Sequence, residues 1–181
     1  MRILVVNPFG ATEAYGQENL ARIARPDTEF DIVNIADVYP LKNNQWLYFR
    51  YMWTDGTLEK VMWAEKQGYD AVFISCNLDI GLYEARQLVD ISVTATLEAA
   101  ALVAHMMGSG YSLVTVDHQN GKIQEMLLKI YGLHEQFVSQ RPFDIDANDL
   151  YPDQTPTGEV ISAVVVAARA HGLRPVDGPF G

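Results

Sequence analysis

The chain has 181 residues, enough for one domain or two small lobes with a sizeable apolar core. Its formal net charge of −10 repels phosphate backbones and anionic lipid, so nucleic acid and membrane surfaces are not expected partners. A single cysteine excludes an internal disulfide and gives no zinc-type Cys/His spacing, and no apolar run approaches the roughly 20 residues that span a bilayer, so we expect a cytoplasmic protein.

Short apolar runs alternate with amphipathic runs along the chain. In chain order, we expect a strand at 3–6, a helix at 18–24, a strand at 30–35, a helix at 58–66, a strand at 71–75, a helix at 82–89, a strand at 91–94, a helix at 97–107, a strand at 111–116, and helices at 122–131 and 158–170. Gly68, Gly108 and Gly132 are expected to end three of these helices. Strands separated by helical patterns predict βαβ units, hence an α/β fold with flavodoxin-like layers of parallel sheet.

Residues 46–53, with the sequence WLYFRYMW, are too aromatic for a solvated loop. One interpretation is that they pack against the fold or form a subunit interface. The other is that they form a lid or wall of an apolar substrate pocket.

Polar residues follow several of the predicted strands. In open parallel sheets, ligands bind beyond the carboxyl ends of the strands. The residues at these ends carry hydroxyl, amide, thiol, carboxylate and imidazole groups, and they are Asn7, Ser75, Cys76, Thr94, Thr96, Thr115, Asp117 and His118. Neither Lys nor Arg occurs among them, which favours a carboxylate or carbonyl ligand held by neutral donors and backbone N–H groups.

Cys76 is the sharpest candidate for chemistry. It follows a predicted buried strand and precedes a helix that begins near Gly81. A helix N-terminus lowers the pKa of a thiol, and a thiolate there could abstract a proton next to a carbonyl or add to an electrophilic carbon. Asp79 is expected to cap that same helix. The alternative is that Cys76 is a small buried apolar residue.

Two further residues have a chemical and a structural interpretation. His118 could act as a general base, although a histidine in a turn is more often solvated. Asn7 opens an Asn-Pro turn, and it serves either that turn or a ligand through its amide. The chain has neither a GxGxxG nor a GxxxxGK[ST] loop, so the sequence does not favour dinucleotide or nucleotide binding.

Several blocks along residues 2–140 resemble one known family in the same order. They are RILVVNP at 2–8, GYDAVFISCNLDIGLYEAR at 68–86, VTATLEAA at 93–100 and YSLVTV at 111–116. Together they resemble the aspartate/glutamate/hydantoin racemase superfamily, and the block around Cys76 is the most specific of them.

The resemblance implies an isomerase with two pseudo-symmetric α/β lobes, here residues 1–95 and a shortened, incomplete lobe at 96–181. It implies a cofactor-independent and metal-free reaction, in which the Cys76 thiolate abstracts the α-proton of an amino acid or hydantoin. It also implies a homo-oligomer whose ligand is a small carboxylate or hydantoin. The implied site consists of Cys76 with the binding residues Asn7, Ser75, Asn77, Thr96 and Thr115, and with His118 as an auxiliary acid or base.

The sequence departs from the family pattern most clearly at a second cysteine, which the two-base mechanism needs on the other face of the carbon. Either Pro179 stands at its position or the strand that carries it is lost. Ile80 and Ala95 also replace a usual Pro and Gly. Three interpretations stay open: a truncated or shortened racemase, a one-cysteine isomerase or decarboxylase of the same superfamily, or an inactive carboxylate-binding protein.

Overall fold

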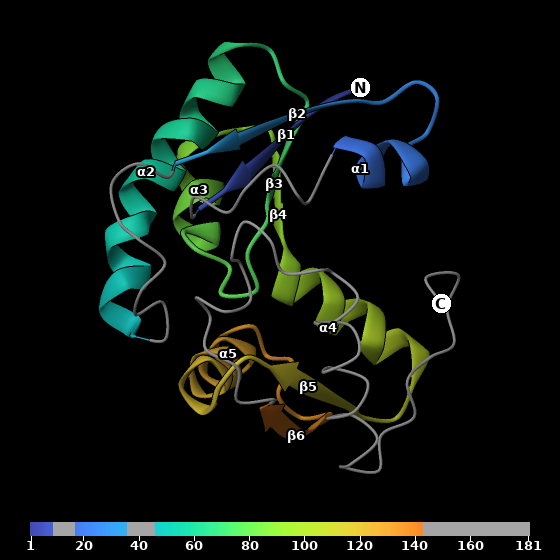
Figure 1. Cartoon of the computed structure of the whole chain (residues 1–181), viewed down its shortest axis with the longest axis vertical. Coiled ribbons are helices and arrows are strands. Elements are labelled where there is room, and N and C mark those ends of the chain that lie inside the picture. The colour runs from blue at the N-terminus through green and yellow to red at the C-terminus, as the bar shows by residue number, and fades with distance from the viewer. Residues whose placement is uncertain (9–16, 36–45, 143–181) are drawn as a thin grey trace.

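The computed structural model describes residues 1–8, 17–35 and 46–142, and these residues form an α/β fold with two parallel sheets (Figure 1). The elements are β1 (Arg2–Asn7), α1 (Gln17–Ile23), β2 (Glu29–Asn34), α2 (Leu47–Lys66), β3 (Ala71–Ile74), α3 (Leu82–Leu88), β4 (Ser92–Ala95), α4 (Thr96–Met107), β5 (Tyr111–Thr115), α5 (His118–Ile130) and β6 (Phe137–Pro142). The α/β class predicted from the sequence is therefore confirmed. The helix predicted at 158–170 and the position of Pro179 lie outside the described residues.

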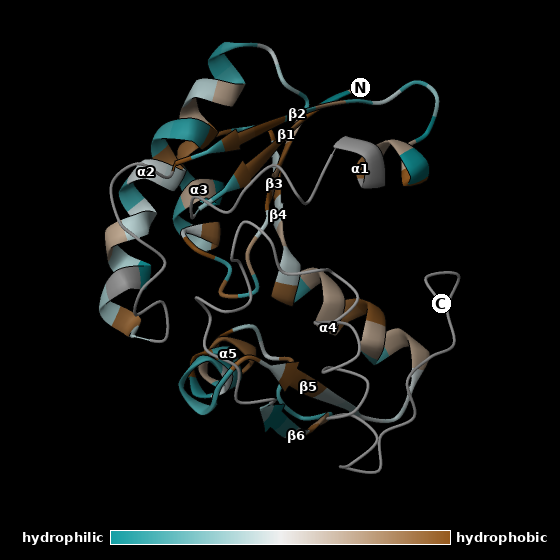
Figure 2. Cartoon of the chain, in the orientation of Figure 1, coloured by the Kyte–Doolittle hydropathy of each residue, from teal (hydrophilic) through white to brown (hydrophobic). Residues whose placement is uncertain are grey.

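The first sheet has the strand order β2-β1-β3-β4, with all neighbours parallel. β1 lies inside the sheet, and its residues Leu4, Val5 and Val6 are all buried, as expected for a strand covered on both faces. β2 lies at the edge, where exposed and half-buried residues alternate over most of the strand. The hydropathy colouring of Figure 2 shows the apolar character of the inner strands.

Helices cover both faces of the first sheet, with α2 and α3 on one side and α1 on the other (Figure 1). α4 leaves the end of β4 and runs toward the second sheet, so that it contacts β4, β5 and α5. One apolar cluster fills the space around β1 and β3, and it includes Leu4, Val6, Val61, Val72 and Ile74. A second cluster joins α2, α4 and α5, and it contains Trp53, Cys76, Leu78, Ile80, Leu97, Ala101, Ile123, Leu127 and Leu128.

Residues 47–53 form the first part of α2, which the helix predicted at 58–66 does not include. α2 begins at Leu47, eleven residues before the predicted start at 58. Trp46 precedes the helix without a side-chain capping hydrogen bond, so local signals give little sign of its start. Trp53 is only 3% exposed in the second apolar cluster, and this tertiary burial outweighs the modest helix propensity of aromatic residues.

The second sheet consists of β5 and β6, which are parallel. β6 has no strand pattern in the sequence, because Phe137–Pro142 contains Ser, Gln, Arg and Pro and lacks a continuous apolar run. Contacts with β5 hold it in place: the rings of Tyr111 and Phe137 lie 6.1 Å apart, and the hydroxyls of Ser112 and Ser139 are 3.0 Å apart. A division into two lobes at residue 95 is consistent with two sheets, and it stays a prediction.

Two of the predicted helix ends are confirmed by their backbone. Gly68 and Gly132 follow α2 and α5 with φ of +75° and +71°, in the left-handed region that glycine adopts without steric cost. Among the described residues, no helix is both long and apolar enough to cross a membrane.

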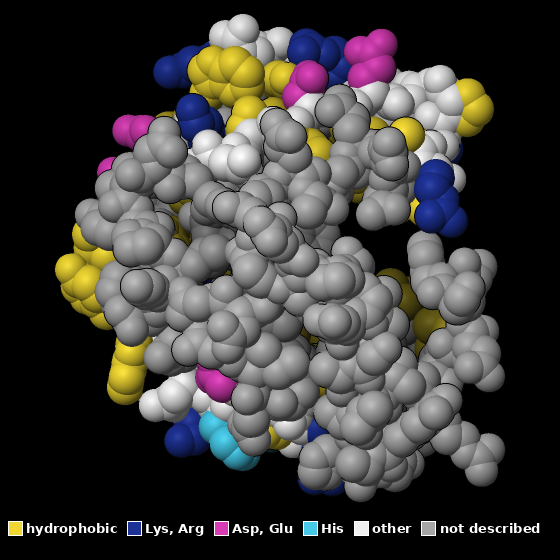
Figure 3. Space-filling model, viewed as in Figure 1, with side chains coloured by type: hydrophobic (Ala, Val, Ile, Leu, Met, Phe, Trp, Pro, Cys, Tyr) yellow, Lys and Arg dark blue, Asp and Glu magenta, His cyan; other side chains and the backbone are white. Residues whose placement is uncertain are grey.

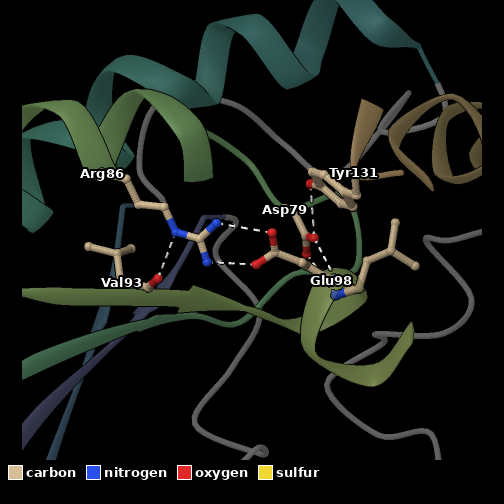
Figure 4. Close-up of polar contacts among 6 residues, drawn as sticks. Asp79, Arg86, Val93, Glu98 and Tyr131 are labelled. Atoms are coloured by element: carbon tan, nitrogen blue, oxygen red, sulfur yellow. Dashed lines mark hydrogen bonds and ion pairs between the residues drawn. The ribbon is translucent and has the colours of Figure 1, made fainter. Parts of the chain in front are cut away.

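An ion pair fastens α3 to the start of α4 (Figure 4). The Arg86 guanidinium donates to both carboxylate oxygens of Glu98, at 3.0 and 2.6 Å, and its Nε donates to the Val93 carbonyl at 3.0 Å. The carboxylate side chain is 14% exposed, so the pair is screened less than a surface pair.

We expect Arg86→Met to lower the free energy of unfolding by about 1–2 kcal/mol, because the largely covered Glu98 carboxylate loses two charged donors. The matched control is Lys129→Met, which removes an exposed i,i+4 pair with Glu125 and should cost about 0.5 kcal/mol or less. Urea denaturation of both variants measures the difference. Equal losses in the two variants would contradict the stronger role of Arg86.

Candidate active site

The carboxyl ends of three neighbouring strands bring most of the predicted site residues together. Val6 is level with Ile74, and Ile74 is level with Ala95, so that Asn7, Ser75 and Thr96 lie at one edge of the sheet. The Ser75 amide donates to the Val6 carbonyl at 2.8 Å, and the Thr96 hydroxyl donates to the Ile74 carbonyl at 3.4 Å. Asn7 is buried and Ser75 is half-buried.

Cys76 lies two residues after the end of β3 at this edge, in the second apolar cluster. It is 5% exposed, and its Sγ accepts a hydrogen bond from the Leu78 backbone N–H at 3.4 Å. Burial raises the pKa of the Cys76 thiol to about 12. The Leu78 N–H and the charge of Arg50 act in the opposite direction, and the Asp79 carboxylate adds to the rise.

The expectation of a lowered thiol pKa is therefore wrong for this structure. α3 begins at Leu82, six residues after Cys76, and the influence of a helix N-terminus falls off beyond its first turn. The thiol is instead surrounded by apolar side chains, which disfavour its charged form.

Asp79 also differs from its expected role as a cap for α3. Its carboxylate accepts hydrogen bonds from the backbone N–H groups of Leu97 at 2.7 Å and Glu98 at 2.8 Å, so it caps α4 (Figure 4). The Tyr131 hydroxyl donates to the same carboxylate at 3.0 Å. Burial is the largest influence on the pKa of Asp79 and raises it, against the effect of these donors.

The loop that carries Cys76 is thereby tied to elements far along the chain. Asp79 lies in this loop with φ of +45°, in the left-handed region, and its side chain is fully buried. The Asp79 N–H donates to the Cys76 carbonyl at 3.0 Å, which closes a turn over residues 76–79. The turn and the cap to α4 together fix the direction of the chain after the thiol.

Arg50 contacts the Cys76 loop, and the sequence patterns do not indicate this contact. It lies on α2, and its guanidinium donates to the Leu78 carbonyl from Nε at 3.1 Å and to the Asp79 carbonyl from Nη2 at 3.4 Å. The ends of β1, β3, β4 and β5 lack Lys and Arg, as the sequence indicates, whereas β6 carries Arg141 next to its last residue. The cation that reaches the Cys76 loop comes from a neighbouring helix. The only signal in the sequence is that residues 46–53 contain a single charged residue.

Thr115 and His118 lie at the carboxyl end of β5 in the second sheet, whereas Asn77 lies on the Cys76 loop. Thr115 ends β5, is buried, and donates from its hydroxyl to the Asp117 carbonyl at 2.7 Å. His118 is exposed and begins α5, whose N-terminus the Asp117 side chain caps through Asn120. Asn77 is exposed on the Cys76 loop, and its carbonyl accepts from Gln124 of α5 at 3.5 Å.

Carboxylates of the chain itself therefore cap the two helices that follow β4 and β5. Asp79 bonds two N–H groups of α4, and Asp117 bonds one of α5. These N–H groups are not available to a ligand carboxylate.

The aromatic segment contributes to a groove as well as to the core. A groove of about 250 Å³ lies between the start of α2 and α5, and its lining residues are Trp46, Leu47, Gln119, Lys122, Ile123 and Met126. Trp46, Tyr48 and Tyr51 are more than half exposed. Figure 3 shows hydrophobic side chains gathered at the left edge of the molecule, where Figure 1 has the start of α2. None of the predicted site residues lines this groove.

Metal-binding chemistry has no side-chain cluster to support it in the described part of the chain. No group of three or more His, Cys, Asp or Glu side chains in residues 1–8, 17–35 and 46–142 could hold a metal ion.

Comparison with known proteins agrees with this architecture. Residues 3–176 match the model of the family described as Asp/Glu/Hydantoin racemase. The chain is 30% identical over 180 residues to hydantoin racemase from Pseudomonas sp. (strain NS671), and the match covers 98% of this chain and 68% of that protein.

Solved structures show the same fold. Allantoin racemase from Klebsiella pneumoniae is 26% identical, with a TM-score of 0.80 over 94% of this chain and 69% of that one. Arylmalonate decarboxylase, at 12% identity and a TM-score of 0.56 over 93% of this chain and 72% of that one, shares the fold alone. The ordered blocks around Cys76, the parallel sheets and the family match lead to one conclusion: this chain belongs to the Asp/Glu/Hydantoin racemase family.

Proposed function

We propose that the chain is a cofactor-independent racemase-like enzyme, and that Cys76 is the base that abstracts a proton from the carbon next to a carbonyl of a hydantoin-type ring. The observation that carries the proposal is the placement of Cys76 at the carboxyl edge of the first sheet, next to Ser75 and close to the strand ends at Asn7 and Thr96. The names of the two relatives, hydantoin racemase and allantoin racemase, support a ring with a stereogenic carbon between an amide nitrogen and a carbonyl.

In the proposed step, the Cys76 thiolate forms an S–H bond as the C–H bond of the stereogenic carbon breaks. The electron pair moves into the adjacent carbonyl as an enolate, and a proton returned to the opposite face gives the other enantiomer. A thiol with a pKa of about 12 is a strong base once ionised, but only about one molecule in ten thousand is ionised at pH 8.

The source of the second proton distinguishes the possible outcomes. With Cys76 as the single thiol, a proton returned by the same sulfur restores the original configuration. Inversion needs a donor on the other face, and we propose His118 for this role, because it begins the helix whose Gln124 contacts the Cys76 loop.

The test is deuterium exchange into enantiopure 5-substituted hydantoins and allantoin in heavy water. We expect wild type to exchange the ring C–H, and Cys76→Ser to do so about a hundred- to ten-thousandfold more slowly, because the hydroxyl is a far weaker acid than the thiol. His118→Gln should keep the exchange and slow the loss of optical rotation. Equal exchange by wild type and Cys76→Ser sinks the proposal.

A second candidate is a one-cysteine decarboxylase, and the single thiol in the sequence is the observation that favours it. Protonation of a carbanion after loss of CO₂ from a malonate-type diacid needs one acid only, which Cys76 could supply. Release of CO₂ without exchange into hydantoins would identify this activity. Thermal stabilisation by a carboxylate with no product would instead identify a binding protein.

The predicted binding roles of Asn7, Ser75, Asn77, Thr96 and Thr115 belong to this proposal, as do a cytoplasmic location and a homo-oligomer. The capped N-termini of α4 and α5 support hydroxyl and amide recognition of a ring over recognition of a carboxylate at a helix end.

A further inference from the structure

Arg50 is the one charged residue in the aromatic segment 46–53, and its side chain is directed to the Cys76 loop. It lies in the first turn of α2 and is half-buried. Both of its hydrogen bonds to the loop go to backbone carbonyls, those of Leu78 at 3.1 Å and Asp79 at 3.4 Å. A guanidinium presents several donors in one rigid plane, so it can hold two neighbouring carbonyls at once.

These two carbonyls belong to the part of the loop that orients the thiol. The N–H of Leu78 donates to the Cys76 Sγ, and its C=O accepts from Arg50, so one residue connects the cation to the sulfur. The following residue, Asp79, has φ of +45°, which is uncommon outside glycine. A loop held in this conformation needs contacts from outside, and Arg50 supplies them from α2.

We propose that Arg50 is a positioning residue for Cys76: its guanidinium fixes the Leu78 and Asp79 carbonyls, and it keeps a positive charge near the sulfur when the thiolate forms. The importance of this role for turnover rests on the proposed function. The role itself concerns the thiol and the loop, and it can be measured without a substrate.

The charged and titratable groups around the thiol act in opposite directions. Asp79, on the same loop, raises the pKa of Cys76, and Arg50, from α2, lowers it. Glu98 of α4 and Tyr131 after α5 act on Asp79, the first raising its pKa and the second lowering it. Loss of Arg50 therefore leaves a carboxylate next to the thiol without the cation that opposes it.

The experiment compares Arg50→Met, Arg50→Lys and the control Arg25→Met by alkylation of Cys76 with iodoacetamide across pH. Arg25 is a suitable control because it pairs with Asp27 on the surface, near the amino ends of the strands. We expect Arg50→Met to move the midpoint of the alkylation pH profile upward by about half to one pKa unit. Because the more basic thiolate is also the better nucleophile, alkylation at pH 10 should slow by roughly two- to fourfold. Arg50→Lys and Arg25→Met should keep the wild-type midpoint.

A second measurement addresses the geometry. Hydrogen exchange of the Leu78 amide, followed by NMR, should be faster in both Arg50 variants than in wild type or Arg25→Met. Methionine offers no donor to the two carbonyls, and lysine keeps the positive charge but lacks the planar set of N–H donors that holds both of them. If Arg50→Met does not fold, the exchange rate of the Leu78 amide in Arg50→Lys tests the positioning role on its own.

The proposal is overturned by a wild-type midpoint in a folded Arg50→Met, or by wild-type exchange at Leu78 in Arg50→Lys. Faster alkylation of Arg50→Met at an unchanged midpoint would assign Arg50 to steric cover alone, and it overturns the proposal too. Failure of the proposed function would give a different result. The wild-type chain would then exchange no substrate proton for deuterium, while the alkylation profiles would still depend on Arg50.

Discussion

Iodoacetamide is expected to alkylate Cys76 in the folded chain at least about fiftyfold more slowly at pH 8 than in the chain unfolded in concentrated guanidinium chloride. Burial raises the pKa of the thiol from 9.0 to about 12, which lowers the thiolate population about a thousandfold. The more basic thiolate is a better nucleophile by about twentyfold, which recovers part of that loss. The 5% exposure of Cys76 slows the folded chain further.

The pH profile separates ionisation from access. In the folded chain the rate should rise about tenfold per pH unit from pH 8 to pH 11, whereas the unfolded chain should level off above pH 9. Because the folded pKa is the higher one, the buried thiol stabilises the fold fully below pH 9, and this contribution is lost as the pH rises toward 12. The single cysteine leaves no competing site, and Cys76→Ser should take up no label. A plateau below pH 9 in the folded chain would show that the thiol ionises readily.

Asp79→Ala should lower the free energy of unfolding by about 3 kcal/mol or more. The substitution leaves the N–H groups of Leu97 and Glu98 and the hydroxyl of Tyr131 without their acceptor. It also places alanine at a φ of +45°, which costs about 1 kcal/mol relative to residues that tolerate this region. Urea denaturation of each variant measures the loss.

Two matched variants separate the causes. Asp79→Gly relieves the backbone and still loses the cap, so it should be about 1 kcal/mol more stable than Asp79→Ala. Asp79→Asn keeps one acceptor oxygen. Because burial raises the pKa of Asp79 in the fold, the protonated side chain stabilises the fold below its unfolded pKa, and the contribution is lost as the pH rises through the folded pKa. The free energy of unfolding of wild type should therefore exceed that of Asp79→Asn by the largest amount at acidic pH. A difference that grows with pH would contradict the raised pKa.

Sequence patterns located the part of the site that depends on short stretches of chain. The apolar run before Ser75 and Cys76 identified β3, and the rule for parallel sheets then indicated the edge at which Asn7 and Thr96 also lie. These inferences need only the apolar pattern of each strand and the parallel direction of neighbouring strands.

The predictions that proved wrong or incomplete involve interactions between residues far apart in the sequence. Asp79 was assigned to the nearest helix, but its carboxylate caps α4, 18 residues further on. Arg50 reaches the loop from a helix 28 residues earlier, and no local pattern signals that contact. The raised pKa of Cys76 likewise follows from apolar side chains on α4 and α5, whose packing against the loop no local motif describes.

The contact between Tyr131 and Asp79 has a consequence for folding during synthesis. The two residues are 52 positions apart, with Asp79 made first. At about 5–20 residues per second, a ribosome needs roughly 3 to 10 seconds to travel that distance. For that interval the Cys76 loop lacks one of its three carboxylate bonds, so the nascent chain should expose its thiol to oxidants and electrophiles until Tyr131 has emerged.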